Sequence, residues 1–333
     1  MRRIAITLLL VATAACSGSG SKQVSTSPSP TPSTAAVTGA FAPASGRAST
    51  VVAKVAVGGQ PCGVVVAAGF AWVTDAKSAT LKRIDLETNT VSGSFPVDKT
   101  PCELMAARGS LWVVTQSGVL DRVDPSSGKV IARVQVGAMS YEAVDAFGSI
   151  WVTNRNTRTL TQVDPANNRV IGTALISGIY PGGIVGAGGA LWIGNDTGGA
   201  DFVVRFDPKT KVPREIKAGS RPAFVAVSAG SVWVSNEDDG TVSRISVATE
   251  QVVSTIPAGE RPVNLSAGPG KAGEVWVPDD RGDLLTRIDP ATGTAIERLA
   301  VGRGPAVVAV TATEVWVTHF EDGSVWRIAI GAR

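Results

Sequence analysis

The chain of 333 residues contains a single histidine, three cysteines and no block of like charge. With one histidine it cannot build a zinc site rich in histidine, and neither Cys62 nor Cys102 stands at a zinc-ligand spacing. The absence of a C-x-x-C-H haem-attachment motif disfavours a redox role of the quinoprotein kind. The net charge is only +3 and the Lys and Arg residues are dispersed, so nucleic-acid binding is not indicated.

The N-terminal segment has the pattern of an export signal: two arginines, an apolar run from Ile4 and small residues before Cys16. The run is too short to span a bilayer as a mature helix. The stretch TAAC resembles a bacterial lipobox, with Thr13 in place of the usual aliphatic residue. The resemblance implies that residues 1–15 are a signal peptide and that Cys16 is lipidated. A simple secretory signal with an incidental Cys16 is the alternative.

Residues 16–49 are rich in Ser, Thr, Pro, Ala and Gly, with too few large apolar side chains to offset chain entropy. We expect a flexible tether between the lipidated cysteine and a folded region over residues 50–333. The predicted location is the cell membrane, with a lipid anchor and with the folded region on the extracytoplasmic side.

The folded region has few helix signals and a strong repeat. Short runs of Val, Ile, Trp and Thr are separated by Gly, Pro, Asn and Asp, which predicts an all-β protein. Seven tryptophans recur at intervals of 39 to 43 residues: Trp72, Trp112, Trp151, Trp192, Trp233, Trp276 and Trp316. Each unit holds four candidate strands, which is the content and period of a β-propeller blade.

The two ends of the folded region complete each other. The seventh unit stops after its third strand, at SVWRIAIGAR, and residues 50–59 (TVVAKVAVGG) resemble the fourth strands of the other units. Pairing these two segments closes the ring and removes an exposed strand edge. We therefore predict a monomeric, seven-bladed β-propeller with four-stranded blades, whose last blade is closed by the N-terminal strand.

Several short motifs resemble the YVTN/YncE family of seven-bladed propellers across residues 50–333. They are IWVTN, LWIGN and VWVSN, the turn RIDPATG, and the recurring G-x-x-P. The streptogramin B (virginiamycin B) lyases belong to a similar repeat class. That family uses a histidine, a glutamate and magnesium to open a cyclic ester by elimination, so the resemblance implies one enzymatic alternative for this chain.

Residues that recur in the units are expected to build the scaffold. An Asp before the third turn suits an Asx-type turn and recurs as Asp85, Asp124, Asp164, Asp207 and Asp289. An arginine two residues earlier recurs as Arg83, Arg122, Arg205, Arg244, Arg287 and Arg327. A ring of arginines that binds an anion is the alternative, but we favour a structural role for them. The tryptophans are expected to fill the space between neighbouring sheets.

His319 follows its tryptophan by three residues. In the other units this position holds Asp75, Thr115, Asn154, Asn195, Asn236 and Asp279, short polar residues that end a strand. The expected role is therefore a local hydrogen bond in a turn. The alternative is proton transfer, because histidine titrates near neutral pH.

Residues that break the repeat are candidates for a ligand site at the channel mouth. On the innermost strands, Glu103, Tyr141, Glu142 and Asn264 interrupt an apolar pattern near the predicted channel entrance. Ionised carboxylates need partners or water, which predicts a wet channel. Glu103 and Glu142 could share a proton or hold a metal, or only hydrate the channel.

Charged loops converge on the same predicted face. The joining loops bring Arg221, Arg261 and Arg303, and the loops of units five to seven bring Glu237, Asp238, Asp239, Asp279, Asp280, Asp283, Glu321 and Asp322. Mutual salt bridges are the first expectation. A Ca²⁺ or Mg²⁺ site is the alternative, since hard cations prefer carboxylate and carbonyl oxygens.

Cys62 and Cys102 occupy matching positions in consecutive units. Such positions on neighbouring inner strands should lie on the order of 7 Å apart, near the upper limit for a disulfide. Export permits the bond, so we predict a disulfide between them.

Two functions follow from these observations. We favour a non-catalytic, lipid-anchored binding scaffold that recognises an unidentified protein, glycan or small ligand on the channel-mouth face. The alternative is a metal-dependent lyase or hydrolase resembling streptogramin B lyase, for which His319, Glu103 and Glu142 are the catalytic candidates.

Overall fold

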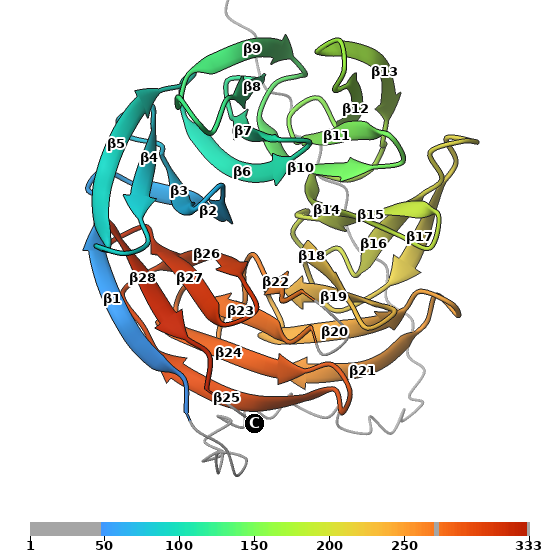
Figure 1. Cartoon of the computed structure of the whole chain (residues 1–333). Helices are drawn as coiled ribbons and strands as arrows, with labels where there is room; N and C mark the ends of the chain where they lie inside the picture. The colour runs from blue at the N-terminus through green and yellow to red at the C-terminus, as the bar shows by residue number, and fades with distance from the viewer. Residues whose placement is uncertain (1–47, 270–272, 332–333) are drawn as a thin grey trace, which may run out of the picture. The chain divides into compact units, whose positions relative to one another are not determined.

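The computed structural model describes residues 48–269 and 273–331. The predictions for the signal peptide, for Cys16 and for most of the tether lie outside these residues. Within them, seven four-stranded antiparallel sheets stand around a common centre (Figure 1). The predicted all-β, seven-bladed propeller is confirmed. In the described part of the chain, no helix has the length and apolar character of a membrane span.

Each blade runs from an innermost to an outermost strand in chain order. Blade 1 comprises β2 (Pro61–Ala67), β3 (Phe70–Asp75), β4 (Thr80–Asp85) and β5 (Thr90–Pro96). Blade 2 comprises β6 (Pro101–Ala107), β7 (Ser110–Thr115), β8 (Val119–Val123) and β9 (Val130–Gln135). Blade 3 comprises β10 (Ser140–Ala146), β11 (Ser149–Asn154), β12 (Thr159–Asp164) and β13 (Arg169–Leu175). Blade 4 comprises β14 (Pro181–Ala187), β15 (Ala190–Asn195), β16 (Phe202–Phe206) and β17 (Pro213–Lys217).

The remaining blades follow the same order, with one irregularity and one exchange. Blade 5 comprises β18 (Pro222–Ser228), β19 (Ser231–Asn236), β20 (Thr241–Ser246) and β21 (Val252–Pro257). Blade 6 comprises β22 (Ser266–Ala267), β23 (Val275–Asp279), β24 (Leu284–Asp289) and β25 (Thr294–Ala300), so its inner strand is very short. Blade 7 comprises β26 (Pro305–Val310), β27 (Glu314–His319), β28 (Ser324–Ala329) and, as its fourth strand, β1 (Thr50–Ala56).

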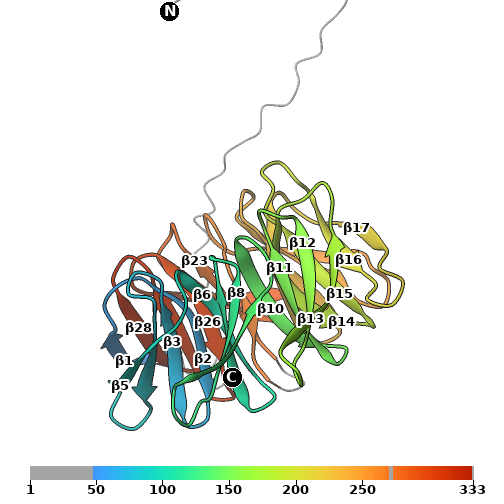
Figure 2. The same cartoon turned by 90° about the horizontal axis from the view of Figure 1, so that it is seen from above.

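Ring closure by the N-terminal strand is confirmed. β1 pairs antiparallel with β28, from Thr50 opposite Ala329 to Ala56 opposite Ser324, and Figure 2 shows the two strands side by side. Val55 and Val57 are buried in the cluster between blades 7 and 1. The anchored segment begins slightly earlier than predicted, because the backbone N–H and the hydroxyl of Ser49 donate to the Glu297 carboxylate at 2.6 and 2.8 Å.

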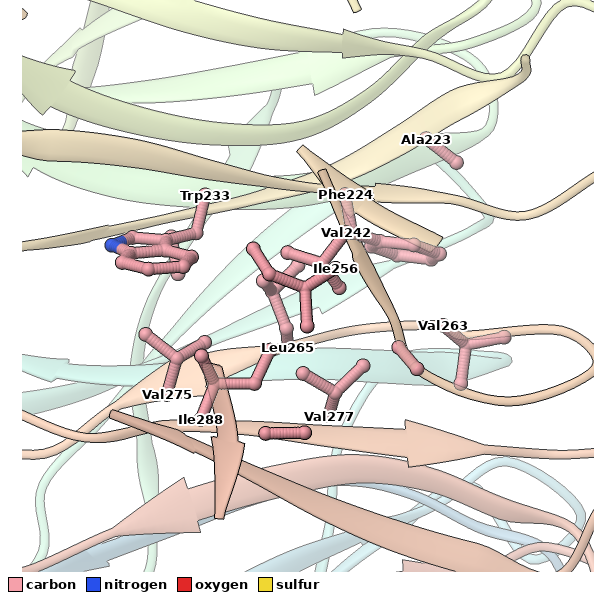
Figure 3. Close-up of a cluster of buried hydrophobic side chains, with 13 residues drawn as sticks. Ala223, Phe224, Trp233, Val242, Ile256, Val263, Leu265, Val275, Val277 and Ile288 are labelled. Atoms are coloured by element: carbon pink, nitrogen blue, oxygen red, sulfur yellow. The ribbon is translucent and has the colours of Figure 1, made fainter. Parts of the chain in front are cut away.

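The repeated tryptophans lie buried between neighbouring sheets. Figure 3 shows one such layer, in which Trp233 and Val242 of blade 5 face Val275 and Ile288 of blade 6. In five blades the indole N–H also donates to the carbonyl five residues earlier, as from Trp72 to Ala67 at 3.2 Å. Tryptophan therefore supplies both a large apolar surface and a donor that fastens the preceding hairpin.

The repeated arginines and aspartates serve the blades, as predicted. Arg122 lies opposite Trp112 on the next strand, with its guanidinium 5.0 Å from the ring centre, and blades 5 to 7 repeat this cation–π contact. Asp85 accepts the backbone N–H groups of Glu87 and Thr88, both at 2.9 Å. These bonds lower the pKa of Asp85 and make the expected Asx-type turn.

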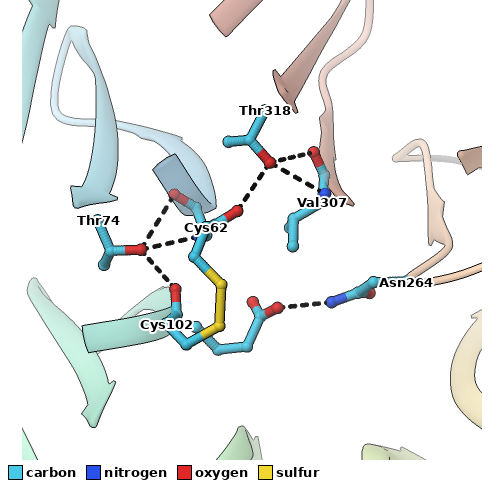
Figure 4. Close-up of a disulfide and its surroundings, with 8 residues drawn as sticks. Cys62, Thr74, Cys102, Asn264, Val307 and Thr318 are labelled. Carbon is cyan, nitrogen blue, oxygen red and sulfur yellow. Dashed lines mark hydrogen bonds between the residues drawn. A yellow bond between two sulfur atoms is a disulfide. The ribbon is translucent and has the colours of Figure 1, made fainter. Parts of the chain in front are cut away.

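Threonines two residues after the tryptophans join blade to blade. The Thr153 hydroxyl donates to the carbonyl of Gly182 in the next blade at 2.8 Å, and Thr74 reaches Cys102 in the same way (Figure 4). Thr318 donates to the carbonyl of Cys62 at 2.7 Å and so connects blade 7 to blade 1. The threonine of the hydrophobic-V-T-N motif is thus part of the seam between inner strands.

Candidate functional site

A cavity of about 260 Å³ opens at the channel mouth, where the inner strands begin and the loops after the second strands converge. We call it the loop-face cavity. Its wall includes Tyr141 and Phe224, whose ring centres lie 5.7 Å apart with a tilt of 31°. Val263 and Val307 add further apolar surface. The cavity therefore offers an aromatic and aliphatic surface to a ligand.

The disulfide between Cys62 and Cys102 forms part of the same wall. It joins the second residues of two neighbouring inner strands, β2 and β6, whose Cα atoms are 5.0 Å apart (Figure 4). This separation is shorter than the expected value of about 7 Å and lies within the range of protein disulfides.

Charged side chains alternate in sign around the rim. Asp196 is buried and accepts ion pairs from Arg155 at 2.8 Å and from Arg221 at 2.6 Å. Arg221 also lies 3.2 Å from the Glu237 carboxylate, and the Arg261 Nε donates to Asp280 at 2.7 Å. Each guanidinium remains partly exposed while its carboxylate partner is largely buried. The rim is thus a preorganised set of donors held in place by acids beneath them.

Glu237 is the rim residue closest to titration at neutral pH. Burial raises the pKa of its carboxyl to about 7, and the charge of Asp196 adds to this effect while Arg221 opposes it. Protonation of Glu237 within the physiological pH range would therefore weaken its ion pair with Arg221.

The floor of the loop-face cavity is a hydrogen bond across the channel. Asn264 Nδ2 donates to Glu103 Oε1 at 2.7 Å, from blade 6 to blade 2 (Figure 4). Asn264 lies in the irregular segment before β22, which leaves its side chain free to point away from the blade. Burial raises the pKa of Glu103 to about 7, opposed by the bond from Asn264. Burial and the negative charge of Glu103 also raise the pKa of Glu142 well above its ordinary value.

His319 lies away from this site. Its side chain is fully buried and packs on Trp326, with ring centres 4.9 Å apart. It does not line the loop-face cavity. Neither ring nitrogen has a hydrogen-bond partner among the described residues, and burial lowers its pKa to about 4.

Three of the solved structures that share this architecture illustrate the similarity to this chain. Streptogramin B lyase matches with a TM-score of 0.70 and 16% identity, over 84% of this chain and 96% of that one. Hydrazine synthase from Kuenenia stuttgartiensis matches with a TM-score of 0.70 and 14% identity, over 81% and 95%. A catalytically inactive histidine-to-alanine variant of virginiamycin B lyase from Staphylococcus aureus, with quinupristin, matches with a TM-score of 0.69 and 15% identity, over 87% and 98%. This chain is a seven-bladed β-propeller of that structural type. No protein-family model and no curated protein matches it by sequence.

The propeller brings together most of the predicted site residues. Glu103, Tyr141, Asn264, Arg221 and Arg261 all line the loop-face cavity. Glu142 does not, and instead lines a second cavity on the other side of the Glu103–Asn264 bond.

The grouping of Arg303 with Arg221 and Arg261 is wrong. Arg303 is mostly exposed and pairs with Asp322 at 2.9 Å, outside the loop-face cavity. The reason is a shift of one residue: Arg221 and Arg261 directly precede a proline, whereas Gly304 stands between Arg303 and Pro305.

Sequence reasoning missed Arg155 and Asp196. Both stand four residues after a repeated tryptophan, as do Glu237 and Asp280. Four consecutive units with a charge at this position were a usable signal, because that position starts the loop that faces the channel mouth.

The expected turn hydrogen bond of His319 does not form with normal geometry, although the Ser324 backbone lies near the imidazole. In blade 6, Asp279 accepts the N–H groups of Glu260 and Arg261 at 2.8 and 2.9 Å. In blade 7 the two equivalent N–H groups, of Arg303 and Gly304, donate to Asp322 and Asp283 instead. The imidazole is left to pack against an aromatic ring.

Three of the acids proposed for a cation site have other partners. Asp279 accepts backbone N–H groups, and Asp280 and Asp322 pair with arginines. Over residues 48–269 and 273–331, no group of three or more His, Cys, Asp or Glu side chains is placed to hold a metal ion.

The burial of His319 predicts an acid-sensitive contribution to stability. Its folded pKa of about 4 lies below the unfolded value of about 6.5. As the pH falls below about 6.5, the unfolded chain gains a proton that the folded chain rejects, so the free energy of unfolding decreases. His319→Asn restores the residue type of blades 3 to 5. Urea unfolding at pH 7.5 and 4.5 should show the variant gaining roughly 2 to 3 kcal/mol relative to wild type at the lower pH. A difference that does not change with pH would contradict the assignment.

Proposed function

We propose that this propeller is a non-catalytic binding protein that holds a small ligand, or a terminal group of a glycan or peptide, in the loop-face cavity. The observation that carries the proposal is the placement of the Tyr141–Phe224 pair beneath the rim of Arg155, Arg221 and Arg261. A flat apolar group would lie against the rings, and polar groups of the ligand would meet the guanidinium and carboxylate groups above.

The scaffold supports this choice over catalysis. The only histidine of the chain is buried against Trp326, away from the cavity. Every arginine of the rim already has a carboxylate partner, so the site is organised before a ligand arrives, which favours binding.

A lyase or hydrolase is the second candidate. It is favoured by Glu103, whose pKa of about 7 suits a general acid or base, and by the fold shared with streptogramin B lyase. The similarity to streptogramin B lyase extends to the fold alone. The proposal of a lyase or hydrolase therefore depends on Glu103 and on binding of a divalent cation at this site.

We also propose that the propeller is held at the outer face of the cell membrane by a lipid on Cys16. The export-signal pattern before Cys16 and the composition of residues 17–49 support this location. Mass spectrometry of the membrane fraction should find an acylated N-terminal Cys16; a soluble chain with an unmodified N-terminus would argue for simple secretion.

The binding proposal is tested by a thermal-shift screen of small ligands against residues 48–333, with and without Ca²⁺ or Mg²⁺. Tyr141→Ala should weaken binding of a confirmed ligand about fivefold or more, because stacking on an aromatic ring contributes about 1 kcal/mol or more. Phe147→Ala is the matched control, since it removes an exposed ring of the same blade outside the cavity. Ligands that bind Tyr141→Ala normally would contradict the site. Turnover that requires a divalent cation and is lost in Glu103→Gln would favour the enzyme.

A further inference from the structure

A second, larger cavity lies on the other side of the Glu103–Asn264 hydrogen bond. Its volume is about 520 Å³, and it is lined by the middle and end of the inner strands. We call it the inner-strand cavity. It shares only Glu103, Asn264 and Val307 with the loop-face cavity. The bond between Asn264 and Glu103 therefore separates two chambers of one channel, and each chamber can take a ligand of its own.

The two chambers differ in chemistry. The inner-strand cavity is surrounded by partly exposed aliphatic side chains, among them Val66, Met105, Val144, Val185 and Val310. Among the described residues that line it there is no Lys, Arg or His, whereas three arginines line the loop-face cavity. Its only titratable side chains are Glu103 and Glu142. A chamber whose only titratable side chains are two carboxyl groups selects for positive charge.

Glu142 has an unused acceptor. Its Oε2 atom is buried and accepts no hydrogen bond of normal geometry among the described residues, and the one backbone N–H that acts on the carboxyl group is that of Ile184. Gly183 of the next blade leaves room for it, because a Cβ at that position would stand 2.8 Å from Oε2. The backbone is held separately, by a 3.2 Å bond from the Glu142 N–H to Thr153 Oγ1. A buried carboxylate oxygen without a partner is costly, and a cationic donor would remove that cost.

We propose that the inner-strand cavity binds an organic cation with an apolar body, whose ammonium group lies between Glu103 and Glu142. The charge would be shared by the two carboxyl groups, and the apolar body would contact the valines of the wall. This proposal does not require that a ligand binds in the loop-face cavity, although the two cavities share Glu103, Asn264 and Val307.

Binding of a cation at this site should release a proton, which can be measured. Burial raises the pKa of both carboxyl groups, and the charge of Glu103 raises the pKa of Glu142 further, so the pair retains a proton near neutral pH. The other titratable groups on the loop-face side of Glu103 are Tyr141, which interacts with it electrostatically, and the charged rim residues Arg155, Asp196, Arg221, Glu237, Arg261 and Asp280. An ammonium group favours the ionised carboxylates, so its binding should expel a proton and strengthen as the pH rises from 6 to 8.

The test uses three probes of equal length on the full chain: hexylammonium, hexan-1-ol and hexanoate, measured by isothermal titration calorimetry in two buffers of different ionisation enthalpy. Hexylammonium should bind at least about tenfold more tightly than hexanol and release protons, and hexanoate should bind more weakly still. Glu142→Gln should weaken hexylammonium binding about tenfold and leave hexanol unchanged. Glu87→Gln, which neutralises an exposed turn glutamate, and Tyr141→Ala should both bind hexylammonium normally.

Three results would overturn the proposal. The first is equal binding of hexylammonium and hexanol, or no binding to the folded wild type. The second is a Glu142→Gln variant that binds hexylammonium as wild type does. The third is loss of hexylammonium binding in Tyr141→Ala, which would place the probe in the loop-face cavity.

Discussion

A chain that begins at Gly59 should melt at least about 6 °C below one that begins at Ala48. The shorter chain lacks β1, and with it the pairing to β28 and the buried side chains of Val55 and Val57. Burying each valine stabilises the fold by about 1.5 kcal/mol or more, and the loss also uncovers an edge of β28. For a domain of this size, 1 kcal/mol corresponds to about 2 to 4 °C. Differential scanning calorimetry measures the shift.

Two controls separate ring closure from other effects of truncation. A chain that begins at Thr50 retains β1 and loses only the contact of Ser49 with Glu297, so it should lose a small part of the stability. A synthetic peptide of residues 48–58 should bind the chain that begins at Gly59 and raise its melting temperature. If the chains that begin at Gly59 and Ala48 melt alike, the N-terminal strand does not close the ring.

Replacing Cys62 and Cys102 by alanine should lower the free energy of unfolding by roughly 4 kcal/mol. The bond closes a loop of 40 residues, and the chain-entropy model gives about that value for a loop of this length. It also joins blades 1 and 2 at the wall of the loop-face cavity, so ligand binding there should weaken as well. Denaturant unfolding of wild type and double variant measures the stability difference.

A reducing agent provides the matched control. It should destabilise the wild type to the level of the double variant and leave the double variant unchanged, because the only other cysteine of the chain is Cys16. If mass spectrometry of the unreduced mature protein found free thiols at Cys62 and Cys102, the disulfide would be contradicted.

The repeat made the scaffold predictable. A feature that recurs every 39 to 43 residues reports a local structural role, so the tryptophans, the Asx-turn aspartates and the missing fourth strand could be interpreted without coordinates. Alignment of the units also placed Cys62 beside Cys102, because matching positions on consecutive inner strands are neighbours in a ring.

Features that depend on contacts between distant blades were not predictable in this way. Asn264 and Glu103 are 161 residues apart and meet only because the segment before β22 leaves its blade. The ion pairs of Asp196 connect loops of three blades, which no single unit contains. For Arg303, an offset of one residue was enough to move the side chain out of the cavity.

His319 does not have the structural role of the residues at the same position in other blades, because one of its neighbours differs. In blades 3 and 5, Thr161 and Ser243 bond the asparagine at the aligned position. Trp326 occupies the same place in blade 7. Its ring packs against the imidazole, and Lys54 Nζ makes a cation–π contact with it, 3.7 Å from the ring centre. A comparison of the third strands, and not only of the tryptophan strands, would have shown this change.

The most direct test of the account is a crystal structure of residues 48–333 with a ligand from the thermal-shift screen. The central claim is that the residues that break the repeat at the channel mouth form the binding site. Ligand density is therefore expected against Tyr141 and Phe224, with polar contacts to Arg221 or Arg155. Density on the outer strands of a blade, with an empty loop-face cavity, would contradict it.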